Sequence, residues 1–226
     1  MSAKDPYASL PERLSESVKS LSDIAVEAIE RLIAEGALEP GERINESHLA
    51  TRLGISRGPI REACKTLAQA GLLEGFTHRG MYVRTLSAED AQRLYELRAV
   101  LAGFAGRLIV REATEATLAA LSSLQEQMDR AVAGSDAEEY FRLNLEFHEA
   151  LITATGSPPL IDSYMRTVKQ LLLTRRRGLV TAQNIAVSNG EHHRIMDALL
   201  ARDAAAAEAA MRSHVENGFS RLLGTD

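Results

Sequence analysis

The chain of 226 residues has no tryptophan, a single cysteine and only 4% aromatic residues. The lone cysteine, Cys64, excludes an internal disulfide and is typical of a reducing compartment. No apolar run approaches the roughly 18 residues that a membrane-spanning helix needs, and the polar N-terminus lacks a signal-peptide core. We therefore expect a soluble, cytoplasmic protein with no membrane partner and no thiol chemistry.

The scarcity of aromatic residues, together with abundant alanine and leucine, argues against a β-sandwich and favours helices packed on helices. The formal net charge of −5 excludes a uniformly basic protein, but the charge is unevenly distributed. Residues 43–84 hold seven Lys/Arg against three acidic residues, whereas residues 85–226 hold 15 Lys/Arg against 19 acidic residues. The sequence thus indicates a small basic module attached to a larger acidic one.

Apolar periodicity and turn residues divide the chain into three parts. Residues 1–20 are polar, contain two prolines and are expected to form a flexible N-terminal arm. Residues 21–86 give three helices and then a small β-hairpin. Residues 87–226 give an all-α bundle of about six helices. The predicted fold is therefore mainly α.

Cap residues predict where the helices of the third part begin and end. Ser135 and Glu138 are spaced as a capping box for a helix that reaches Thr155. Three further helices are expected to begin near Pro159, near Ser188 and at Asp203. In the first helix of this part, apolar residues at helical spacing are expected to share one face: Leu94, Leu97, Leu101, Phe104 and Leu108.

A proline interrupts an apparent helix within "LATRLGISRGPIREACKTLAQAGLL", residues 49–73. Ser56 is a favourable N-cap, which places Pro59 in a first helical turn, where a proline loses no hydrogen bond. The shorter helix before it ends at Gly54, which can adopt the positive φ of a tight turn. Two helices joined in this way predict a helix-turn-helix, whose second helix lies in the DNA major groove.

The start of that second helix carries the candidate DNA-binding residues. Arg57 and Arg61 lie one turn apart, and arginine can donate two hydrogen bonds to guanine. Lys65 lies one turn further, toward phosphate, while Gly58 and Pro59 permit close approach. A wing at the hairpin tip would enter the neighbouring minor groove through His78, Arg79 and Gly80. The alternative is a solvated basic face on an ordinary three-helix unit.

Three of the six histidines are predicted to converge in the helical part. His148 follows Asn144 by about one turn, His192 opens a later helix, and His214 lies on the last helix. Three imidazoles and an amide oxygen can bind a metal between facing helices. Taken singly, each histidine is more often a hydrogen-bonded core residue than a metal ligand. His193 is expected to face solvent.

Two regions of the chain resemble a known protein family. The stretch "INESHLATRLGISRGPIREACKTLAQAGLLE…HRGMYV" is similar to the N-terminal winged helix of GntR transcription factors. Residues 88–223 resemble the FCD domain of the FadR subfamily, through "ELRAVLAGFA", "NLEFHEALITATGSPPL" and "EHHRIMDALLARDAAAAEAAMRSH". The resemblance implies a metabolite-responsive regulator with a winged helix-turn-helix followed by an FCD domain. Most such relatives are repressors released by a ligand.

The resemblance also implies roles for individual residues. In the family, the arginines matching Arg57 and Arg61 contact DNA bases, and wing residues contact the minor groove. Arg98 matches an arginine that reaches into the ligand cavity.

Many FCD domains bind a divalent metal through an aspartate and three histidines. His148, His192 and His214 match these histidines, whereas Asn144 replaces the aspartate. A neutral amide is a weaker ligand than a carboxylate and leaves the site more positive, which favours an anionic effector. The expected metal is zinc, with nickel or manganese as alternatives.

These observations predict a homodimeric transcription regulator, a repressor rather than an enzyme. It would bind double-stranded operator DNA with an inverted repeat and respond to a small organic acid, a carboxylate or sugar acid. One alternative is a metal-independent GntR regulator with a structural histidine cluster. The other is a metallohydrolase with a three-histidine site, but neither Glu149 nor Glu191 has a motif that places it beside a metal-bound water.

Overall fold

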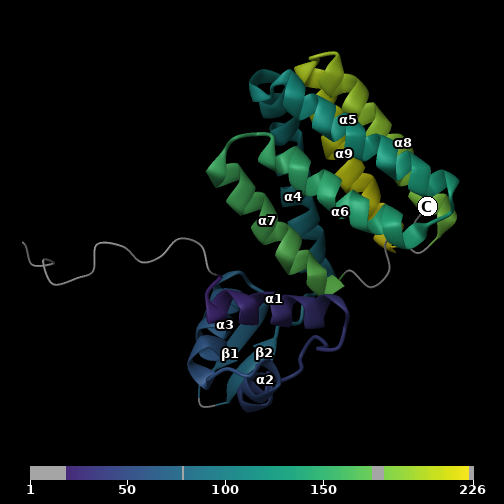
Figure 1. Cartoon of the computed structure of the whole chain (residues 1–226). Helices are drawn as coiled ribbons and strands as arrows, with labels where there is room; N and C mark the ends of the chain where they lie inside the picture. Colours follow the sequence, from purple (N-terminus) through teal and green to yellow (C-terminus); the bar gives the residue numbers. More distant parts are fainter. Residues whose placement is uncertain (1–18, 78, 175–180, 224–226) are drawn as a thin grey trace, which may run out of the picture.

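The structure is a computed structural model that describes residues 19–77, 79–174 and 181–223 (Figure 1). Residues 1–18 of the predicted N-terminal arm lie outside this range. The first part contains α1 (Leu21–Ala34), α2 (Glu46–Leu53), α3 (Arg57–Gln69), β1 (Leu73–Phe76) and β2 (Gly80–Val83). The two strands form an antiparallel hairpin in which Leu73 pairs with Val83 and Phe76 with Gly80. This order confirms the predicted winged helix-turn-helix fold.

The proline in α3 lies where the cap pattern predicts. Ser56 occupies the N-cap position, although its side chain makes no capping hydrogen bond, and Pro59 falls in the first turn of α3. Gly54 ends α2 with a φ of +68°, which allows the short turn between the two helices. A compact core between α1, α3 and the hairpin fixes this geometry through Ala25, Ile29, Ile60, Ala63, Leu67, Leu72 and Val83.

The second part is helical throughout its described length. It contains α4 (Ala88–Glu112), α5 (Glu115–Ala133), α6 (Ala137–Thr153), α7 (Pro158–Leu171), α8 (Ala182–Leu200) and α9 (Ala204–Leu223), with a short 3₁₀ helix η1 (Leu172–Thr174) after α7. The crossing of α4 and α9 is close because α4 offers glycines there. A Cβ at Gly106 would lie 2.7 Å from the carbonyl oxygen of Ala207, and one at Gly103 would lie 3.2 Å from that of Glu208.

Two predicted helix starts are wrong. The N-cap of α6 is Asp136, whose side chain accepts a hydrogen bond from the Glu139 amide. Ser135 instead adopts a left-handed φ of 55° in the turn before it. Helix α8 begins at Ala182 rather than near Ser188, because Thr181 caps it. The starts of α7 and α9 lie within one residue of the predicted positions.

The predicted apolar face of α4 is also wrong in part. Leu108 is buried and Leu94 and Leu101 pack against the core, but Leu97 and Phe104 are 48% and 50% exposed. Where α4 crosses α9 most closely, it presents the small residues Gly103 and Gly106 instead, because larger side chains would not allow this approach.

Helix α7 and η1 pack against the winged helix, as Figure 1 shows at the lower end of α7. Leu172 and Leu173 pack against the apolar core of the winged helix. Lys169 forms an ion pair with Glu30 of α1, with 2.7 Å between Nζ and Oε1. Within the described ranges, no helix has both the length and the apolar character required to cross a bilayer.

Candidate functional site

The N-terminal end of α3 presents a row of cations to solvent. The side chains of Arg57, Arg61 and Lys65 are 53%, 58% and 67% exposed. Gly58 and Pro59 add little bulk between them, and a Cβ at Gly58 would find its nearest neighbouring atom 3.9 Å away. This surface is therefore accessible to a macromolecular partner.

The described part of the wing adds further basic groups. Arg79 is exposed at the tip of the hairpin, and Gly80 begins β2 with a φ of 96°. His78, the third predicted wing residue, lies outside the described residues. The sequence interpretation missed Arg43, whose backbone forms a β-bridge with Tyr82 and whose guanidinium lies beside Gly80. Only the local excess of positive charge could have indicated it.

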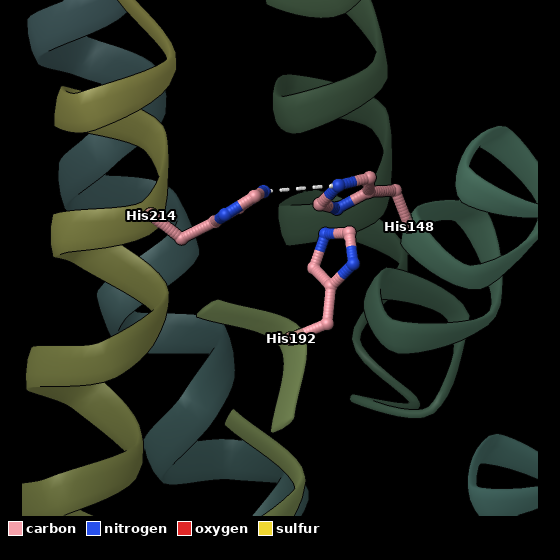
Figure 2. Close-up of side chains that lie close together, drawn as sticks. All are labelled: His148, His192 and His214. Atoms are coloured by element: carbon pink, nitrogen blue, oxygen red, sulfur yellow. Dashed lines mark hydrogen bonds between the residues drawn. The ribbon is translucent and has the colours of Figure 1, made fainter. Parts of the chain in front are cut away.

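The second candidate site lies inside the helical part, where three helices bring three imidazoles together (Figure 2). They are His148 of α6, His192 of α8 and His214 of α9, and one nitrogen of each lies within 4.8 Å of the others. The Nε2 atoms of His148 and His214 are 3.1 Å apart. Within the described residues, no other group of histidine, cysteine and carboxylate side chains has this metal-ligating geometry.

Several polar atoms at this cluster lack a protein partner. Both ring nitrogens of His192 and Oδ1 of Asn144 are buried without a hydrogen bond to any described residue. Leaving one such group unpaired costs about 1–3 kcal/mol. Nitrogen and oxygen donors of this kind suit a divalent metal ion, so the donor set fits the metal that the sequence pattern predicts.

A buried ion pair fixes the orientation of His214. Nδ1 of His214 lies 2.7 Å from Oε2 of Glu191, which accepts its hydrogen bond when that nitrogen is protonated. Two guanidinium nitrogens of Arg221 also donate to Glu191, each at 2.9 Å. In this tautomer, Nε2 of His214 presents its lone pair to the other imidazoles. Sequence interpretation missed Arg221, although its position seven residues after His214 places it on the same face of α9.

The electrostatics favour neutral imidazoles at His192 and His214 beside a charged carboxylate. Burial lowers the pKa of His192 well below its usual value and also lowers the pKa of His214. Burial would raise the pKa of Glu191, but hydrogen bonds from His214, Arg221 and Asn217 outweigh it and lower this pKa to about 2. The neutral form is the one in which histidine binds metals.

A cavity of about 110 Å³ opens beside the cluster. Its lining includes Arg98, Asn144, His148, His214 and Arg221. Arg98 is 8% exposed and donates from Nε to the Tyr164 hydroxyl at 3.0 Å, and no salt bridge joins it to a carboxylate among the described residues. Arg98 is thus a buried residue of the cavity and not a surface residue.

The remaining histidine of this region lies apart from the cavity. His193 is exposed, as predicted, and its Nε2 lies 2.8 Å from the Asp129 carboxylate of α5. It therefore provides a natural control for experiments on the cluster.

A winged helix-turn-helix joined to an all-α domain defines a class of DNA-binding transcription regulators. Residues 21–83 match the family described as bacterial regulatory proteins, gntR family, and residues 93–217 match the FCD domain. The chain therefore belongs to the GntR family of transcription regulators, with the FadR-like arrangement of a winged helix followed by an FCD domain.

Individual relatives agree with this assignment. The chain is 32% identical over 196 residues to an uncharacterized HTH-type transcriptional regulator, YdhC, of Bacillus subtilis. The aligned region covers 86% of this chain and 87% of the relative. It is 31% identical over 185 residues to a probable D-xylose utilization operon transcriptional repressor of Paenarthrobacter nicotinovorans, covering 81% and 80%.

A solved structure shares the fold. The E. coli protein McbR/YncC superposes with a TM-score of 0.78 at 22% identity, covering 92% of this chain and 99% of that one. The matched families and relatives are transcription regulators and not enzymes, so the metallohydrolase alternative is excluded.

Proposed function

We propose that this regulator is a cytoplasmic, homodimeric repressor that leaves its operator when a small organic anion binds the helical domain. The observation that carries the proposal is the composition of one cavity. It combines a buried arginine that lacks a described carboxylate partner with His148 and His214, two members of a three-histidine cluster whose geometry suits a metal. Both features favour an anionic ligand.

The DNA contacts are proposed for the exposed start of α3 and for the wing. Arg57 and Arg61 would donate to guanine edges in the major groove, and Gly58 and Pro59 would let the helix approach. Lys65 would contact phosphate. The wing residues His78, Arg79 and Gly80 would enter the minor groove. Two such heads in a symmetric dimer would require an inverted repeat.

The metal site is proposed to use His148, His192, His214 and Asn144. Bound there, a divalent cation, zinc in the first instance with nickel or manganese as alternatives, would supply positive charge that polarises and holds an anion. A metal-independent histidine cluster is the rival account. It is less favourable because it leaves both nitrogens of His192 and the amide oxygen of Asn144 without hydrogen bonds.

Arg98 is proposed to bind the carboxylate of the effector. A guanidinium can donate two parallel hydrogen bonds to a carboxylate, which the ammonium group of a lysine cannot do. Its present partner, Tyr164, belongs to α7, whose far end contacts the winged helix. An anion that draws Arg98 away from Tyr164 would therefore bias the orientation of α7 and of the DNA-binding head.

The proposal is tested by combining metal analysis with DNA binding. Protein purified without a nickel column should contain a divalent metal, and small carboxylic acids that raise its melting temperature should weaken operator binding. Arg98→Ala should abolish the response to the acid while operator affinity without the acid stays unchanged. An Arg98→Ala protein that still responds fully would remove the cavity from this account.

A further inference from the structure

Both candidate base-reading arginines contact one carboxylate. Oε2 of Glu46 accepts from Nη2 of Arg57 at 3.1 Å and from Nε of Arg61 at 2.9 Å. The side chain of Glu46 is only 21% exposed, whereas both arginines are more than half exposed. A single mostly buried acceptor thus holds two otherwise solvated guanidinium groups.

Local structure explains why this carboxylate is available. Asn45 caps α2 through a hydrogen bond from the His48 amide, so Glu46 falls in the first turn, where the helix dipole stabilises negative charge. Burial would raise the pKa of Glu46, but the hydrogen bonds from Arg61 and Arg57 outweigh it and lower this pKa. The carboxylate therefore stays ionised at neutral pH.

We propose that Glu46 is a specificity-determining residue that acts through Arg57 and Arg61. It orients the two guanidinium groups before DNA arrives, and it offsets part of their attraction for phosphate. The inference rests on the proposed role of these arginines in reading bases.

The physical reason is that the two kinds of DNA contact depend on different properties of arginine. Binding to any sequence depends on positive charge near phosphates, which Glu46 reduces. Binding to guanine depends on the direction of the guanidinium fork, which Glu46 preserves. A group that weakens binding to non-specific DNA but leaves the contacts with guanine intact raises the ratio of specific to non-specific affinity. Prior orientation also lowers the ordering cost of the specific contact.

A nearby acidic residue offers a matched control. Glu62 lies on α3 itself and pairs with Lys65 at 2.8 Å, and both of these side chains are exposed. Removing the charge of Glu62 changes the net charge of the same surface by the same amount. It leaves the contacts of Arg57 and Arg61 with Glu46 in place.

The experiment uses the full-length protein and DNA duplexes with a randomised central segment. Wild-type protein selects its preferred duplex, and a scrambled duplex of equal composition serves as the non-specific probe. Dissociation constants for both are measured by fluorescence anisotropy at two salt concentrations. The variants are Glu46→Ala, Glu46→Gln, Glu62→Gln, Arg57→Ala and Arg61→Ala.

Glu46→Ala should tighten binding to the scrambled duplex by about threefold to tenfold, with a steeper salt dependence, because the arginines regain their full charge. Binding to the selected duplex should not tighten in parallel, so the ratio of the two affinities falls. Glu46→Gln keeps an acceptor oxygen without the charge and should give an intermediate ratio. Glu62→Gln should shift both affinities by the same factor.

Each other outcome has a defined meaning. If Glu46→Ala and Glu62→Gln both shift the two affinities equally, Glu46 contributes only net charge and the inference is overturned, while the proposed function stands. If wild-type protein enriches no sequence, or if Arg57→Ala and Arg61→Ala leave the ratio unchanged, the base-reading proposal itself fails. If thermal denaturation shows that the Glu46→Ala protein is not folded, the ratio of the two affinities in Glu46→Gln tests the role of Glu46.

Discussion

At the level of single residues, the helical cavity holds charges that do not cancel. Glu191 is already paired with Arg221 and His214, and Asn144 supplies only an uncharged oxygen to the cavity. Arg98 contributes a buried positive charge that forms no salt bridge with a described carboxylate. A divalent cation held by neutral ligands would add to this excess, and the missing negative charge is the one that an anionic effector would bring.

Replacing Asn144 with Asp tests this balance. A carboxylate is the better ligand for a divalent cation, so Asn144→Asp should tighten the metal, while the lost net charge should weaken an anionic effector. Metal titration of the chelator-treated protein measures the first effect, and thermal shift with small carboxylic acids measures the second. His193→Ala, outside the cluster, should change neither. An Asn144→Asp protein with unchanged metal affinity, or with both affinities raised, would show that Asn144 is not a ligand.

The role of a residue could be predicted from the sequence where it depends only on neighbouring residues of the chain. Pro59 and Gly54 act within one turn of chain, so the start of α3 and the end of α2 followed from the sequence. The approach of His148, His192 and His214 depends on how three helices pack, and helical spacing predicted it only together with the family resemblance. The Glu46 contact with Arg57 depends on the crossing of two helices, and no local pattern indicated it.

At the level of helices, errors arose where two local signals compete. Ser135 and Asp136 are both good N-caps, and only the left-handed turn at Ser135 makes Asp136 the cap. Helix α4 carries a stripe of large apolar residues and a stripe of small ones, and periodicity alone cannot say which packs inside. The glycines allowed α9 to approach so closely that the small stripe became the buried one.

Helix α7 contacts both the cavity and the winged helix. Tyr164 near its middle contacts Arg98 in the cavity, and Lys169 near its end pairs with Glu30 of α1. Lys169→Glu should repel Glu30 and lower the coupling between effector and DNA binding by about 1 kcal/mol, roughly fivefold. The measurement is operator affinity with and without a saturating acid identified by thermal shift.

Two further variants make the α7 test specific. Arg166→Glu places the same charge change on an exposed position of α7 and should leave the coupling intact. Adding Glu30→Lys to Lys169→Glu restores an opposite pair and should restore the coupling. A double variant as uncoupled as Lys169→Glu would mean that the ion pair plays no part in the signal.

At the scale of the whole molecule, the arrangement leaves one apolar stripe of α4 exposed. Leu97, Val100 and Phe104 are 48%, 54% and 50% exposed and recur at three- and four-residue spacing, so they lie along one side of the helix. An exposed apolar stripe of this kind is typical of a protein–protein interface. A symmetric dimer would pair the same stripe from two chains and set the distance between the two winged helices.

Placing negative charges on this stripe should therefore disrupt the dimer without changing how one winged helix binds DNA. Leu97→Glu combined with Phe104→Glu should give a monomer in light scattering, because burying two carboxylates without partners costs more than the apolar contact contributes. Affinity for an inverted repeat should fall sharply, since the second half-site is lost, while affinity for a single half-site should stay unchanged. Val187→Glu, at an apolar α8 position that is 47% exposed, serves as the control and should remain a dimer. A Leu97→Glu, Phe104→Glu protein that is still dimeric would show that the subunits meet elsewhere. If its affinity for the half-site falls as much as its affinity for the full repeat, the substitutions have instead damaged the winged helix.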